Sequence, residues 1–106
     1  MWKASGTTIE MAVGDYGIGL PIKINGVTFG ENDSVKLRVS SARNLTEKLS
    51  VVFAEITDNT VELSLTEAQS ALLPVGEYVY ALDWYRDEVF MCNVIPQGVF
   101  RVVRKA

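Results

Sequence analysis

The chain has 106 residues, a length that suits one domain around a single core, and its 48% hydrophobic and 22% charged residues are typical of a globular protein that folds alone. Ten Lys and Arg against thirteen Asp and Glu leave a formal charge of −3, so the sequence lacks the basic surface that nucleic-acid binding requires. Because the chain contains no histidine, Ser-His-Asp and Cys-His relays and imidazole metal sites are excluded, and we expect neither an enzyme nor a cofactor.

Alternating apolar and polar residues predict the first two strands, at 7–13 and 18–24. Asn25-Gly26 follows the second strand, and this pair of residues accepts the positive φ angles of a type I′ turn. We therefore predict a hairpin at this point, with a returning arm that ends at Phe29.

The middle of the chain continues the alternation, which favours strands with one face on a core. The predicted elements are a turn at 30–33, a strand at 35–39, a polar connection at 41–49, a strand at 50–57, a hairpin turn at Asp58-Asn59 and a strand at 60–65.

One helical signal interrupts the strands. Thr66 suits the N-cap position and Gln69 stands three residues later, which forms a capping box, while Pro74 ends the segment. We predict one short helix at 66–72. Three further strands are predicted at 76–85, 89–95 and 99–103, with Asp87 and Pro96-Gln97-Gly98 at the connections.

The spacing of these elements predicts the fold class. About eight or nine short strands separated by turn residues are typical of a sandwich of two packed sheets. We therefore expect an all-β, antiparallel sandwich that forms one domain over residues 1–106, with a single short helix near 66–72.

The cysteine content and the N-terminal sequence indicate the cellular compartment. Cys92 is the only cysteine, so no intramolecular disulfide can form, and a place inside a strand predicts a buried or half-buried thiol. The first residues lack the apolar run of a signal peptide, and no stretch approaches the ~18 apolar residues of a membrane helix. We expect synthesis in the cytoplasm and no membrane partner.

The segment Pro74-Val75-Gly76-Glu77-Tyr78 resembles the tyrosine corner of immunoglobulin-type sandwiches. In such a corner a tyrosine hydroxyl bonds to backbone a few residues upstream. We expect Gly76 and Tyr78 to form this corner, with the Tyr78 ring in the core, and the sandwich to be immunoglobulin-like.

Taken in order and spacing, the segments 63–68, 72–82 and 93–102 resemble small structural proteins of tailed phages. The family they resemble most is the N-terminal domain of phage baseplate upper proteins. Gly14-Asp15-Tyr16 and the alternating residues after it are similar to the start of the first long strand in that family. The resemblance covers most of residues 8–103.

This resemblance implies a non-enzymatic virion or prophage protein. Such a protein is made in the bacterial cytoplasm, is located in the virion tail, and acts through contacts with copies of itself or with neighbouring tail proteins. The sequence does not choose between tail, neck and head-tail positions.

Four residues are candidates for the contact surface. Trp84 and Tyr85 lie near a strand end, where exposed aromatic rings favour an interface, and Arg101 and Arg104 lie in the basic C-terminal stretch. The strand 99–103 is hydrophobic on both faces except at Arg101. We predict that this strand is a sheet edge that pairs across an interface.

A free-standing binding module is the alternative. A carbohydrate-binding or adhesion domain would use Trp84 and Tyr85 as an aromatic platform. The acidic residues Glu77, Asp83, Asp87 and Glu88 could in principle supply paired carboxylates for glycoside hydrolysis, but most of them flank turns, where solvated carboxylates are ordinary.

Overall fold

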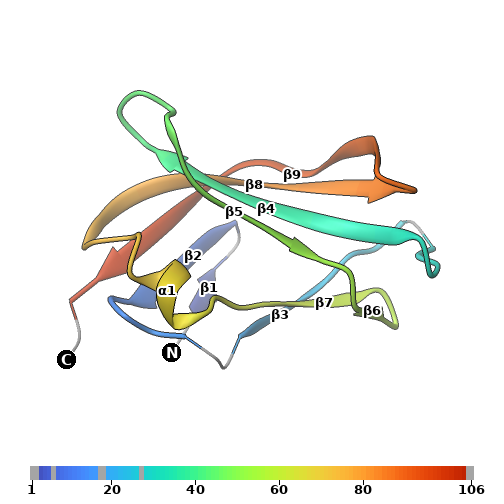
Figure 1. The fold of residues 1–106 in the computed structure, drawn as a ribbon, viewed down its shortest axis with the longest axis horizontal. Coiled ribbons are helices and arrows are strands. Elements are labelled where there is room, and N and C mark those ends of the chain that lie inside the picture. Colours follow the sequence, from blue (N-terminus) through green and yellow to red (C-terminus); the bar gives the residue numbers. More distant parts are fainter. Residues whose placement is uncertain (1–2, 6, 17–18, 27, 105–106) are drawn as a thin grey trace.

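Two β-sheets face each other in the computed structural model, in which residues 3–5, 7–16, 19–26 and 28–104 are described (Figure 1). The larger sheet contains, in spatial order, β1 (Lys3–Ser5), β2 (Thr8–Ala12), β9 (Val89–Val103), β8 (Gly76–Arg86), β4 (Asp33–Ser41) and β5 (Glu47–Phe53). The smaller sheet contains β3 (Leu20–Lys23), β7 (Thr60–Leu63) and β6 (Ile56–Thr57). A single turn of helix, α1 (Glu67–Ser70), connects β7 to β8.

The core lies between the two sheets. Buried apolar side chains of both sheets form one cluster, because alternate residues of each strand point to the same face. Its members include Ile9 and Met11 from β2, Val35, Leu37 and Val39 from β4, Val61 and Leu63 from β7, Tyr78, Tyr80 and Leu82 from β8, and Phe100 and Val102 from β9. The predicted all-β sandwich with one short helix is confirmed.

Strand pairing departs from a purely antiparallel pattern at one place. β2 pairs with β9 in parallel, with Ile9 beside Phe100 and Ala12 beside Val103. Parallel neighbours need a long crossover connection, and here nearly the whole chain lies between the two strands. The other strand pairs are antiparallel, so the larger sheet is mixed.

The hairpin predicted at Asn25-Gly26 is wrong. Gly26 has a φ of 89°, but β3 pairs with β7 rather than with a returning arm, and residues 28–30 form no strand. Ile24 continues the β3–β7 pairing through a 2.8 Å hydrogen bond from its N–H to the Asn59 carbonyl. Ile18 and Val27, at the ends of the predicted strand and turn, lie outside the described residues.

Two local predictions are confirmed. Asp58 and Asn59 have φ angles of 51° and 58° and join β6 to β7 as a hairpin. The Thr66 hydroxyl accepts from Gln69 N–H, and the Gln69 side chain accepts from Thr66 N–H, so the capping box starts α1. No helix in the described part of the chain is long and apolar enough to cross a membrane.

The last two predicted strands are one strand. β9 runs through Pro96, because a bulge places Pro96 and Gln97 between the pairs Tyr80–Gly98 and Leu82–Ile95. A bulge tolerates proline, which cannot donate to the ladder. Residues 99–103 lie between β8 and β2, so the prediction that they form a sheet edge is wrong.

Candidate functional site

The end of the larger sheet where β8 turns into β9 carries the polar and aromatic side chains that could make a site. Asp87 and Glu88 form the turn with φ angles of 51° and 65°, and Asp87 N–H donates to the Asn32 carbonyl over 3.0 Å. The loop 28–32 and the turn 87–88 therefore lie side by side.

An ion pair between the exposed Arg86 and the buried Asp33 fixes this end. Arg86 Nε and Nη2 lie 2.8 and 3.2 Å from the two carboxylate oxygens of Asp33, and Gly30 N–H donates to Asp33 Oδ2 over 2.6 Å. Arg86 Nη2 also donates to the Thr28 carbonyl over 3.2 Å. The Arg86 hydrogen bonds hold the pKa of Asp33 at about 2, against the opposing effect of burial.

Trp84 lies underneath this ion pair, so the prediction of an exposed interface residue is wrong. Its side chain is only 9% exposed. Phe29 packs edge-on against it at 5.5 Å between centroids, and the Arg86 guanidinium lies 5.0 Å over its ring. The indole Nε1 is buried and makes no hydrogen bond within the described part of the chain.

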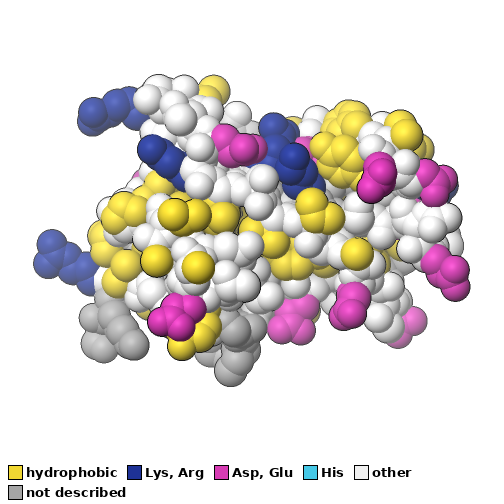
Figure 2. All heavy atoms as spheres, in the orientation of Figure 1, with side chains coloured by type: hydrophobic (Ala, Val, Ile, Leu, Met, Phe, Trp, Pro, Cys, Tyr) yellow, Lys and Arg dark blue, Asp and Glu magenta, His cyan; other side chains and the backbone are white. Residues whose placement is uncertain are grey.

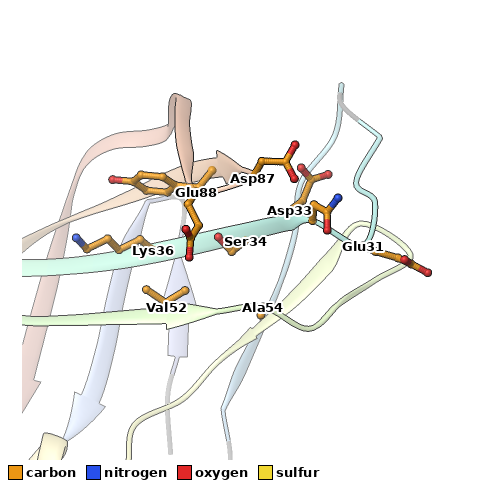
Figure 3. A pocket seen from close by; sticks show the side chains of 10 residues that line it. Glu31, Asp33, Ser34, Lys36, Val52, Ala54, Asp87 and Glu88 are labelled. Carbon is orange, nitrogen blue, oxygen red and sulfur yellow. The ribbon is translucent and has the colours of Figure 1, made fainter.

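A depression of about 690 Å³ opens on the outer face of the sheet beside this turn (Figure 3). Lys36 and Ser34 come from β4, Val52 and Ala54 lie on the β5 side, and the turn contributes Asp87 and Glu88 (Figure 3). Half-buried Tyr85 forms one wall, and Glu31, Asn32 and Asp33 complete the lining. Because Asp33 is paired with Arg86, the depression is acidic through Glu31, Asp87 and Glu88, which face only the Lys36 ammonium.

A second buried carboxylate lies further along the same outer face. Arg38 Nε donates to Asp83 Oδ2 over 2.7 Å, and the Asn93 amide donates to Asp83 Oδ1. Asp83 is 1% exposed, so its partners cover it completely. In the described residues, no three Asp, Glu or Cys side chains gather as metal ligands, and these two carboxylates are held by nitrogen donors instead.

The start of β9 carries exposed apolar side chains. Val89, Phe90 and Met91 are 61%, 50% and 44% exposed, and Cys92 is also exposed. Figure 2 shows hydrophobic side chains gathered above the end of the sheet where β8 passes into β9, with Asp and Glu side chains around them. We call residues 89–92 the apolar arm. The prediction that Cys92 is buried or half-buried is wrong.

The residues of the predicted tyrosine corner lie at the start of β8. Tyr78 is buried, and its hydroxyl donates to the Pro74 carbonyl over 2.7 Å, next to Gly76.

The two predicted interface arginines lie elsewhere. Arg101 lies on the interior strand β9, and its guanidinium pairs with the carboxylates of Glu77 at 3.3 Å and Glu10 at 3.9 Å. Arg104 follows β9 and is exposed, at the opposite end of the sheet from the depression.

Of the four predicted interface residues, Trp84 and Tyr85 lie at this site, but only Tyr85 lines the depression, because Trp84 is buried. The apolar arm was missed, although its signal is visible in the sequence as an uncharged run directly after Asp87-Glu88. The pair Asp33–Arg86 could not be read from the sequence, because 53 positions separate the two residues.

Comparisons with protein-family models, curated proteins and solved structures gave no match.

Proposed function

We propose that this chain is a non-enzymatic structural module that works by protein–protein assembly, of the kind found in phage and prophage tails and baseplates. The apolar arm is the observation that supports this most. Singly exposed apolar side chains are ordinary, but contiguous ones on a small protein mark interaction sites. Val89, Phe90 and Met91 are each more than two-fifths exposed, so this strand presents apolar side chains on both of its faces, and Phe90 is contiguous with the Tyr85 ring.

The residues around the apolar arm resemble those of a protein interface. Tyr85 packs edge-on against Phe90 with 5.8 Å between ring centroids, which extends the apolar surface, and Asp87 and Glu88 directly precede the arm in the chain. Interfaces commonly combine an apolar centre with a polar rim. The arm therefore suits a second copy of this chain or a neighbouring tail protein. The assignment to a phage tail depends on the sequence resemblance of segments 63–68, 72–82 and 93–102.

Light scattering after size exclusion, across a wide range of concentrations, tests the proposal. The chain is measured alone and then with each protein encoded beside it. We expect a complex that Phe90→Glu weakens and Leu72→Glu does not, because Leu72 is 56% exposed but lies after α1, away from the arm. A monomer at every concentration that binds none of its neighbours overturns the proposal.

Glycan binding is the second candidate, and the depression beside Tyr85 favours it. A half-buried aromatic ring among carboxylates and a hydroxyl offers stacking and hydrogen bonding to a sugar. Trp84 cannot take part, because its ring is buried under Arg86. A glycan array that detects binding by the wild type and not by Tyr85→Ala supports this candidate, and an array without signal removes it.

A further inference from the structure

The first half of β9 has one open edge. β9 pairs with β8 from Val89 to Val102, but β2 pairs only with Phe100–Val103 on the other side. No strand of the described chain pairs with the second edge of residues 89–93. Figure 1 shows this part of β9 at the rim of the molecule. Its outward N–H and C=O groups are therefore available to another strand.

This edge lacks charges, prolines and short length, which keep many sheet edges from pairing, although bulges at Met91 and Val94 interrupt its ladder with β8. Natural edges are protected by charges, prolines or short length. β5 has Glu47 and Lys48, and β3 has Pro21 and Lys23, whereas β1 and β6 contain only three and two residues. Residues 89–93 contain no charge, proline or glycine.

We propose that this edge pairs with the same edge of a second copy, antiparallel and around a two-fold axis, so that the two larger sheets become continuous. This inference rests on the proposed assembly function and names its geometry. The strand is self-complementary, because an axis near Met91 places Met91 beside Met91 and Phe90 beside Cys92 of the second copy. Apolar side chains that are now exposed would then pack across the two strands.

Charge decides the direction of pairing. A parallel arrangement would bring Glu88 beside Glu88 of the second copy, and like charges in direct opposition destabilise a strand pair. In the antiparallel arrangement the two Glu88 residues are about six positions apart, roughly 20 Å along the strand, which exceeds the Debye length of about 8 Å. Antiparallel pairing also matches the closed two-fold symmetry common in dimers.

Cysteine scanning measures the register. Single cysteines are placed at 90, 91 and 93 in a Cys92→Ser background and compared with the native Cys92. The residue on the axis faces its own copy at a Cα distance of about 4.5–5.5 Å, which a disulfide can span. We expect fast disulfide-linked dimer formation at one position and slow formation at its neighbours. Leu72→Cys in the same background gives the rate of random collision, and equal rates at every position contradict the pairing.

Sedimentation equilibrium tests the interface without cross-linking. We expect Met91→Lys to raise the dimer dissociation constant by about tenfold or more, because two like charges meet near the axis, while Leu72→Lys stays within about twofold. Unchanged far-ultraviolet circular dichroism shows that both variants fold. If the wild type assembles and Met91→Lys does not weaken it, the edge pairing is wrong and the assembly proposal stands. If the wild type is monomeric but binds a neighbouring protein, the pairing of two copies is wrong, and the assembly proposal stands.

Discussion

Arg86 and Asp33 face each other across β8 and β4, with the arginine half exposed and the carboxylate almost completely buried. The Arg86 side chain is 44% exposed and that of Asp33 is 1% exposed. A buried carboxylate is stable only when donors replace its water, and Arg86 and Gly30 supply them here. This pair holds the loop before β4 against the turn that presents the apolar arm.

Arg86→Ala should destabilise the fold more than Arg101→Ala does. The two arginines are matched in exposure, at 44% and 45%, but the Glu77 and Glu10 partners of Arg101 are 57% and 29% exposed. Removing Arg86 leaves a buried charge without its main partner, whereas an exposed pair contributes little. In urea denaturation we expect the loss for Arg86→Ala to be at least about twice that for Arg101→Ala. Equal losses of stability for the two variants would show that the burial of Asp33 does not increase the contribution of its ion pair.

The same pair predicts a dependence of stability on acid. The pKa of Asp33 is lowered from about 3.8 to about 2 in the folded chain, chiefly by the Arg86 hydrogen bonds. Because the unfolded chain binds the proton more tightly, the ionised carboxylate stabilises the fold above about pH 4, and this contribution is lost as the pH falls toward about 2. Urea midpoints measured between pH 5 and pH 2 should fall more steeply for the wild type than for Asp33→Asn. Parallel curves would assign the acid sensitivity to other groups.

Local signals in the sequence were sufficient where neighbouring residues decide the structure. The Asp58-Asn59 turn needs only residues that tolerate positive φ, and the capping box needs only Thr66 and Gln69 at the right spacing. The alternation of apolar residues was likewise enough to predict the inward face of β4, because its period fixes which side chains share a side.

Partners distant in sequence decided the rest. Asn25-Gly26 carries a strong hairpin signal, yet β3 gains more by pairing with β7, and Phe29 then packs against Trp84. The period of two already places Trp84 on the inward face of β8 with Tyr80 and Leu82, and the contacts with Phe29 and Arg86 complete its burial. The order of strands in the sheet, which makes 99–103 interior and leaves 89–93 at an edge, is also invisible to local patterns.

Substitutions of Tyr78 can separate the contribution of its ring to stability from that of its hydroxyl. The ring is 8% exposed in the core, and the hydroxyl donates to the Pro74 carbonyl over 2.7 Å. We expect Tyr78→Ala to cost about 3–5 kcal/mol through the cavity it leaves, and Tyr78→Phe about 0.5–1.5 kcal/mol for one hydrogen bond. Tyr80→Phe, which removes the 2.7 Å bond to the Thr7 carbonyl, is the matched control and should cost a similar amount. Equal, negligible losses for Tyr78→Ala and Tyr78→Phe in a urea melt would place the ring at the surface.

Gly98 is required where β9 passes under Tyr80. A Cβ atom at this position would lie 2.5 Å from the Thr7 carbonyl oxygen and 2.5 Å from Tyr80 Cε1, and the first of these is backbone that cannot rotate away. We therefore expect Gly98→Ala to destabilise the fold by about 1–3 kcal/mol, as overpacking commonly does. Gly26→Ala is the control, because its φ of 89° strains alanine while the space around it is open, so it should cost about 1 kcal/mol. A larger loss of stability for Gly26→Ala than for Gly98→Ala in urea melts would contradict this. It would mean that β9 can move away from Thr7 and Tyr80 at little cost in stability.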